Sequence, residues 1–212
     1  YGGFWRLVDE AREATGDLSV GDSMLANPHK TLYTPLEATA LYCKRKGAVR
    51  NTFSLVPEYL RSEADPVAVN YMDRSLQLGR SFRALKLWWV LRSFGVEGIR
   101  ARMAEHIRIA RAFEGWISAD PDWWTGGYSP YPLVTLRAAP REWVGDRARI
   151  DALNEAIMAR INEEGHSFLS HTVLREGFTL RVAIGNIRTE ERHIRGLWDD
   201  LRRIASEERA RL

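Results

Sequence analysis

Apolar side chains recur at helical spacing in the middle of the chain. Between residues 79 and 94 this spacing is carried by four large side chains, namely Phe82, Leu85, Trp89 and Val90. Such a pattern predicts a largely buried helix. The aromatic residues of this segment are therefore expected to belong to a core.

A second helical pattern follows over residues 96–117. Its expected packing stripe consists of Ile99, Met103, Ile107, Ala110 and Phe113. Asp120-Pro121 marks the predicted end of this helix, because proline cannot continue a regular helix. We expect this helix to join two domains.

The remainder of the chain alternates between strand-like and helix-like patterns. The predicted elements are a strand at 133–138, a helix at 149–162, strands at 167–173 and 178–184, and a helix at 189–205. Glu176-Gly177 is expected to form the turn between the last two strands. Thr189 is expected to cap the final helix, with Arg192 and Arg195 on its polar face. Together these elements predict a small α+β domain.

The first part of the chain is less regular. Residues 4–14 have loosely helical spacing, and residues 18–26 form an apolar, strand-like run whose backbone is expected to be buried. A second strand is predicted at 37–43. Residues 47–76 have the weak periodicity that is typical of a long loop with short helical turns.

The segment Asn27-Pro28-His29-Lys30 follows the first strand-like run. Pro28 disfavours the helical conformation for Asn27, so Lys30 is expected to emerge at a strand end, facing a cleft. A partly desolvated site would favour the neutral amine, which is a nucleophile and forms an imine with an aldehyde cofactor. Asn27, His29 and Thr31 could donate hydrogen bonds to an anionic ligand. The alternative is an ordinary solvated lysine in a polar turn.

Composition and charge narrow the class of protein. The 212 residues are 45% hydrophobic, enough for a globular core, and 31 basic against 28 acidic residues leave a formal charge of +3. The basic residues are scattered, so nucleic acid is not an expected partner. Cys43 is the one cysteine, which excludes an internal disulfide, and it is expected to be buried and inert. The sequence has neither an apolar stretch of roughly 20 residues nor a signal-peptide pattern, so a soluble cytoplasmic protein is expected.

Other catalytic patterns are missing from the sequence. The five histidines form no compact ligand set, and with one cysteine a zinc site is not expected. The sequence contains neither a glycine-rich nucleotide-binding pattern nor a serine nucleophile elbow. Lys30 is therefore the main candidate for covalent chemistry.

Four segments, in order along the chain, carry a resemblance to a known family. They are Asn27-Pro28-His29-Lys30 and residues 54–60, 78–86 and 180–184. In these segments the chain resembles the group II pyridoxal-phosphate-dependent amino-acid decarboxylases of the aromatic-L-amino-acid decarboxylase type. The resemblance implies an α/β, fold-type I PLP-dependent transferase-like fold. It also implies that residues 1–95 are the C-terminal part of the large cofactor domain and residues 96–212 the small α+β domain.

The resemblance implies roles for individual residues of the site. Lys30 matches the lysine that binds pyridoxal 5'-phosphate covalently, and His29 and Asn27 match positions around the cofactor phosphate. Tyr59 matches a loop tyrosine that protonates the α-carbon after carbon dioxide leaves. In this family the loop reaches the active site of the partner subunit in a homodimer.

Three arginines also match family positions. Arg80 and Arg83 follow the family's Leu-Gly segment and are expected to anchor structure near the site. Arg181 matches a strand arginine of the small domain, where either a carboxylate ligand or a structural ion pair is possible.

The implied activity is decarboxylation of an L-amino acid, with aromatic substrates favoured, to the amine and carbon dioxide. Tyr59 favours this reaction over the oxidative, aldehyde-forming one, which goes with phenylalanine in related enzymes. The family's aspartate at the pyridine nitrogen, its ring-stacking histidine and its small-residue phosphate segment match nothing in this sequence, so activity depends on upstream residues or a second chain. The alternatives are a non-catalytic fragment or subunit and, less favoured because the charge is balanced, a basic binding module.

Overall fold

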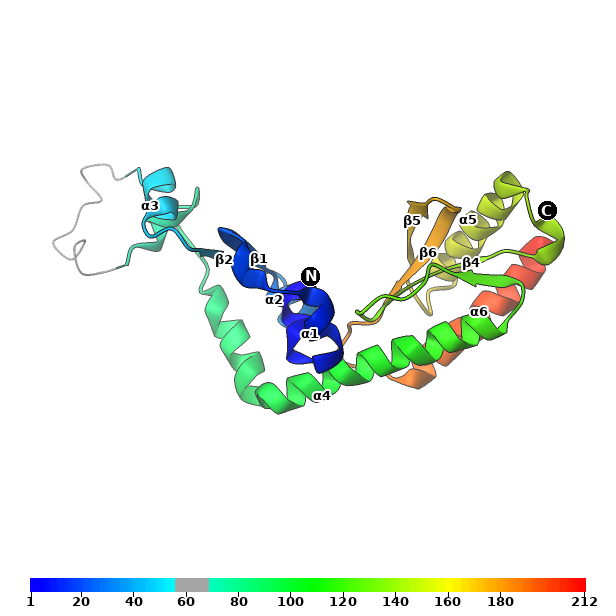
Figure 1. Cartoon of the computed structure of the whole chain (residues 1–212), viewed down its shortest axis with the longest axis horizontal. Coiled ribbons are helices and arrows are strands. Elements are labelled where there is room, and N and C mark those ends of the chain that lie inside the picture. Colours follow the sequence, from blue (N-terminus) through cyan, green and yellow to red (C-terminus); the bar gives the residue numbers. More distant parts are fainter. Residues whose placement is uncertain (56–68) are drawn as a thin grey trace. The chain divides into compact units, whose positions relative to one another are not determined.

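The computed structural model describes residues 1–55 and 69–212, and the chain divides into two compact units (Figure 1). The first unit comprises Tyr1–Arg6 and Thr15–Val96, and the second comprises Leu7–Ala14 and Glu97–Leu212. The boundary falls within α4, Arg83–Ala119, where Gly95 leaves the helical conformation with φ 65° and ψ 170°. Glycine adopts this positive φ readily because it has no Cβ. Within residues 1–55 and 69–212, no helix is long and apolar enough to cross a membrane.

The second unit is built on a four-stranded antiparallel sheet (Figure 1). Its strands are β3 Trp123–Thr125, β4 Leu133–Ala138, β5 Ser170–Leu174 and β6 Gly177–Ala183, in the order β3-β4-β6-β5. Its helices are most of α1 Asp9–Thr15, the second part of α4, the short 3-10 helix Arg141–Trp143, α5 Arg147–Glu164 and α6 Glu191–Arg209.

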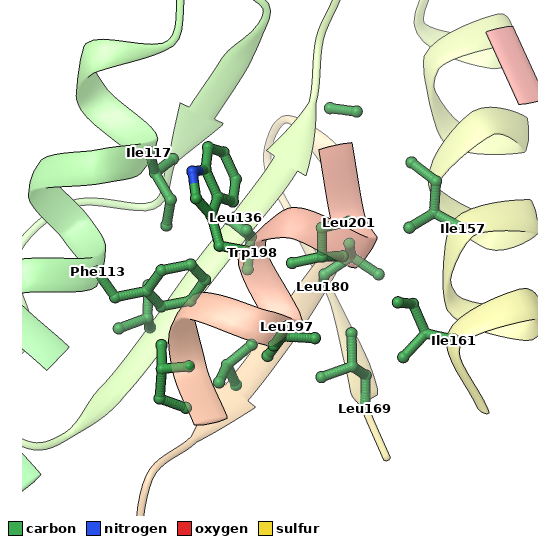
Figure 2. Close-up of a cluster of buried hydrophobic side chains, with 14 of the residues drawn as sticks. Phe113, Ile117, Leu136, Ile157, Ile161, Leu169, Leu180, Leu197, Trp198 and Leu201 are labelled. Atoms are coloured by element: carbon green, nitrogen blue, oxygen red, sulfur yellow. The ribbon is translucent and has the colours of Figure 1, made fainter. Parts of the chain in front are cut away.

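The core of this unit lies between three helices and the sheet, and Figure 2 shows part of it. The labelled side chains come from α4 (Phe113, Ile117), β4 (Leu136), α5 (Ile157, Ile161), the segment before β5 (Leu169), β6 (Leu180) and α6 (Leu197, Trp198, Leu201). The five residues of the predicted α4 packing stripe are each at most 1% exposed. The prediction of that stripe is therefore confirmed.

Most predicted elements of the second unit are present, with shifts at their ends. β4 has the predicted bounds, and α4 ends at Ala119, directly before Asp120-Pro121. The turn between β5 and β6 differs from the prediction. Gly177 is already paired with Leu174, so the turn is formed by Arg175 and Glu176.

Two further details of this unit were not predicted. The N-cap of α6 is Glu190 and not Thr189, because the side chains of Glu190 and His193 form a capping box with the backbone. β3 is a three-residue strand of two tryptophans and a threonine, which is too short to show an alternating pattern.

The first unit contains the segment around Lys30. Its elements are the 3-10 helices Gly2–Leu7, Leu18–Val20 and Tyr71–Arg74, the strands β1 Ser23–Ala26 and β2 Ala40–Cys43, the helices α2 Pro28–Thr31 and α3 Ala48–Phe53, and the first part of α4. β1 and β2 are antiparallel and form a two-stranded sheet, with Ser23 opposite Cys43 and Ala26 opposite Ala40.

Several burial predictions for the first unit are wrong. The run 18–26 forms a strand only in its last four residues, and Val20 and Leu25 are 82% and 66% exposed. Trp89, predicted to lie in a core, is 60% exposed, and Cys43 is exposed. Side chains of β1 and β2 are exposed because, among the residues that the structure describes, these two strands pair only with each other. A lone two-stranded sheet has no second layer to cover it.

Candidate active site

The segment that carries Lys30 is a single helical turn placed directly after a strand. β1 ends at Ala26, and Asn27 is the N-cap of α2 with a non-helical backbone, φ −111° and ψ 88°. Pro28 occupies the first helical position, where its fixed φ is suitable and its missing N–H costs no hydrogen bond. The Lys30 amide donates to the Asn27 carbonyl over 2.9 Å. The backbone of Lys30 is therefore tied to the residue that joins β1 to α2.

The side chains next to Lys30 are held by the residues that precede β2. The Nδ1 atom of His29 lies 2.6 Å from the carbonyl oxygen of Ala38 and 3.2 Å from the Ala38 amide nitrogen. The shorter distance assigns the hydrogen to Nδ1, which donates to the carbonyl and leaves Nε2 on the other edge of the ring. The Thr39 hydroxyl donates to Asn27 Oδ1 over 2.8 Å. The Asn27 amide group therefore keeps its NH2 for another acceptor.

Lys30 itself is exposed, which differs from the expected partly desolvated amine at a cleft. The cause is the same as for β1 and β2: the turn follows a sheet that has no second layer within the described part of the chain. Thr31 behaves differently. It is only 3% exposed, and its hydroxyl has no hydrogen-bond partner among the residues described. A buried hydroxyl of this kind is available to a ligand that supplies the missing acceptor.

An ion pair lies beside this segment. Arg83, at the start of α4, donates from Nε to Glu37 Oε1 over 3.0 Å, and its Nη2 contacts the same oxygen. The hydrogen bond from Arg83, and then its positive charge, hold the pKa of the Glu37 carboxyl below its usual value. This contact agrees with the expected anchoring role of Arg83. The sequence alone does not indicate that Glu37, Ala38 and Thr39 lie beside the Lys30 turn.

The other expected residues have different positions. Arg80 contacts the Tyr71 carbonyl and the Ser75 hydroxyl over 3.4 and 3.2 Å, which is a structural role. Arg181, on β6, donates to the Ser170 hydroxyl of β5 over 3.4 Å. Tyr59 lies outside the described residues, so its place in the site stays a prediction.

One group of possible metal ligands was not visible in the sequence. Glu164, His166 and Asp200 offer ligand atoms within 4.8 Å of one another. Both carboxylates are paired with Arg203, at 2.6 Å for Glu164 and 3.2 Å for Asp200. A cation at this point would have to displace a guanidinium group, so the cluster is better described as an ion-pair network.

Comparison with known proteins gives a consistent result. The pyridoxal-dependent decarboxylase conserved domain matches residues 1–137. Tyrosine decarboxylase 2 of Arabidopsis thaliana is 34% identical over 209 residues, a match that covers 97% of this chain and 38% of the relative. Phenylacetaldehyde synthase of the same plant is 32% identical over 208 residues and is covered to 42%. The crystal structure of Oryza sativa TDC with PLP and tryptamine has a TM-score of 0.91 at 28% identity, covering 98% of this chain and 43% of that one.

These relatives are longer than the chain, which spans about two fifths of their length. The structural match extends over nearly the whole chain, and it confirms the expected α/β class of the fold-type I transferases. The family domain covers well over half of the residues, through both the Lys30 turn and α4. The chain therefore belongs to the pyridoxal-dependent decarboxylase family.

Proposed function

We propose that the complete protein is a pyridoxal-phosphate-dependent decarboxylase that converts an aromatic L-amino acid to its amine and carbon dioxide. One observation carries the proposal: Lys30 lies on an anchored helical turn directly after a strand, in a chain of this family. The aromatic substrate is supported by the relative named tyrosine decarboxylase and by the rice structure that contains tryptamine.

The side chains around Lys30 fit pyridoxal 5'-phosphate. Lys30 offers an exposed amine for a covalent bond to the aldehyde group. The NH2 of Asn27, the Nε2 of a protonated His29 and the buried hydroxyl of Thr31 are donors of the kind that a phosphate accepts. When bound, the cofactor supplies an electron sink for the bond to the α-carboxylate.

Tyr59 is proposed to donate the proton that the α-carbon takes up after carbon dioxide leaves, from the partner subunit of a homodimer. Overall identity does not separate amine from aldehyde formation, because the tyrosine decarboxylase and the phenylacetaldehyde synthase are 34% and 32% identical to this chain. Tyr59→Phe in the complete enzyme should divert product from amine to aldehyde, measured by chromatography of both. Unchanged amine output without aldehyde would contradict this role.

The chain is proposed to contribute two parts of the enzyme. Residues 1–95 would be the C-terminal part of the large cofactor domain, and residues 96–212 the small domain. The carboxylate that holds the pyridine nitrogen protonated would come from the part of the relatives' length that this chain does not span. The exposed thiol of Cys43 fits a reducing, cytoplasmic location.

Borohydride reduction tests the proposal directly. The complete protein is incubated with pyridoxal 5'-phosphate, reduced, digested and analysed by peptide mass spectrometry. A pyridoxyl group should appear on the peptide that contains Lys30, and Lys30→Arg should remove it while leaving the circular dichroism spectrum unchanged. A wild-type protein that is labelled at surface lysines but not at Lys30 would refute the proposed function.

A second candidate is a non-catalytic fragment or subunit of such an enzyme. Its support is the exposure of Lys30 and of apolar side chains such as Val20, Leu25 and Trp89 within this chain. The same labelling experiment on residues 1–212 alone discriminates the two. If Lys30 is labelled in the complete protein but not in the isolated chain, residues 1–212 are a non-catalytic fragment when they stand alone.

A further inference from the structure

We infer that the segment Glu37-Ala38-Thr39, called here the 37–39 clamp, positions the side chains of Asn27 and His29, which precede Lys30, and so sets how tightly the site holds its cofactor. The inference rests on the proposed function and adds positioning residues to it. The clamp acts through Asn27 and His29, which its residues contact directly.

The first contact of the clamp orients the amide of Asn27. The Thr39 hydroxyl donates to Asn27 Oδ1 over 2.8 Å. Only the carbonyl end of an amide accepts such a hydrogen bond, so the contact determines which end of the Asn27 side chain faces Thr39. The NH2 end is then directed elsewhere as a donor. Without the Thr39 hydroxyl the amide could rotate and present its oxygen to an anionic ligand, which is repulsive.

The second contact fixes the ring of His29. With its Nδ1 hydrogen donated to the Ala38 carbonyl at 2.6 Å, the ring is held at one edge by a backbone atom. An anion can then be bound only through Nε2, and only when that nitrogen also carries a proton. The Ala38 contact therefore fixes the orientation of the ring and leaves Nε2 as the ring atom that can face a phosphate.

The third contact ties the clamp to the first turn of α4. Arg83 donates to Glu37 from two of its nitrogens, and the pKa of Glu37 is lowered by this hydrogen bond first and by the charge of Arg83 second. The pair is therefore ionised at neutral pH. The Glu37 side chain is 65% exposed, and ion pairs at such positions contribute little to global stability. Its effect is expected to be local, on the position of the clamp.

These contacts form one continuous path within the first unit. It runs from Arg83 through Glu37 to the rest of the clamp, and from there to the side chains of Asn27 and His29, which precede Lys30. Because the clamp contacts lie at exposed or half-buried side chains, loss of one of them should weaken cofactor binding without unfolding the unit.

The test compares Thr39→Val with Thr52→Val in the complete enzyme. Thr52 is a matched control because it is also exposed and also donates its hydroxyl to a carbonyl, that of Ala48 in α3. The dissociation constant of pyridoxal 5'-phosphate is measured across pH from the absorbance of the Lys30 adduct. We expect Thr39→Val to raise it about tenfold, the effect of one hydrogen bond to a charged group. Thr52→Val should leave it unchanged, and both variants should keep the thermal midpoint of the apoenzyme.

A second measurement does not depend on the cofactor. Hydrogen exchange of the apoenzyme is followed by mass spectrometry in the peptides that contain the clamp and the Lys30 turn. Arg83→Met should speed exchange in both peptides, and Arg83→Lys, which keeps the charge, should restore part of the protection. Arg83→Met with exchange and cofactor affinity as in the wild type would overturn the inference.

The outcomes separate this inference from the proposed function. A wild-type enzyme that carries no pyridoxyl group on Lys30 refutes the function, and the clamp with it. A labelled wild type in which Thr39→Val and Thr52→Val bind cofactor equally refutes the clamp alone.

Discussion

Asn154 on α5 offers the sharpest test of how the second unit is held together. It is fully buried, its Oδ1 accepts the Ala138 amide, and its Nδ2 donates to the carbonyls of Ala138 and Ile150, each over 2.8 Å. The pairing of β4 with β6 extends only to Leu136 opposite Leu180. Ala138, the last residue of β4, is opposite Trp123 of β3 on one side, and on the side of β6 the side chain of Asn154 takes the place of the missing strand.

Asn154→Leu keeps the volume of the side chain and removes all three hydrogen bonds. The Ile150 carbonyl still has its helical bond, but both backbone groups of Ala138 are left buried without partners. Each such group costs about 1–3 kcal/mol, so the free energy of unfolding should fall by about 2–6 kcal/mol. Urea unfolding, followed by tryptophan fluorescence and by circular dichroism, measures this loss. Glu155→Leu, on the exposed side of the same helix, is the control and should change stability by less than about 0.5 kcal/mol.

Asn154→Asp adds a pH dependence to the same experiment. The introduced carboxyl would be buried beside two carbonyl oxygens, so its pKa in the folded state should rise above the unfolded value of about 3.9. A raised carboxyl pKa means that the variant becomes less stable than the wild type as pH increases from the unfolded value through the folded one. The loss should therefore be larger at pH 8 than at pH 5. A loss below about 0.5 kcal/mol for Asn154→Leu, or an equal loss at both pH values for Asn154→Asp, would refute this account of Ala138.

Three further predictions concern the same unit. Phe113→Ala removes a fully buried ring from the core and should lower the free energy of unfolding by about 3–5 kcal/mol in urea titrations. Gly177→Ala should destabilise by about 1–3 kcal/mol, because Gly177 has φ 122° and a Cβ there would contact the Asp151 carboxylate; an unchanged thermal midpoint would contradict this. The hydrogen bond from Arg108 holds the pKa of Glu191 below its usual value, so its stabilisation is present above about pH 4.3 and is lost as pH falls through the lowered value. Arg108→Ala should therefore flatten the acid side of the profile of thermal midpoint against pH, and an unaltered profile would show that this pair contributes nothing.

The sequence predicted the second unit well because the partners of its apolar stripes lie within the chain. The stripe from Ile99 to Phe113 is buried along one face of α4, and its last two residues, Ala110 and Phe113, lie in one core with β4, β6 and α6. Trp89 belongs to an equally apolar pattern in the first part of the same helix, yet it is exposed. Periodicity identifies the apolar face of an element, but it carries no information about what covers that face.

The candidate site also contains residues that the sequence predicts and residues that it does not. Lys30 and its neighbours were identified because their chemistry is local: a proline, a lysine and two donors in consecutive positions. The clamp was missed because its contacts join residues 9 and 12 positions apart, and the pair of Arg83 with Glu37 joins residues 46 apart. No spacing rule connects such residues, and only the folded backbone brings them together.

The turn that carries Lys30 combines a restrained backbone with a free-standing side chain. Hydrogen bonds from the Lys30 and Leu32 amides close the backbone turn of α2, while the amine stands at the end of a flexible four-carbon stem that is exposed. A lysine that must form a bond, release it and form it again needs this combination, since the amine can swing aside for an incoming molecule and return to the same point. Repeated exchange at this position would then require rotation of a side chain and no rearrangement of the fold.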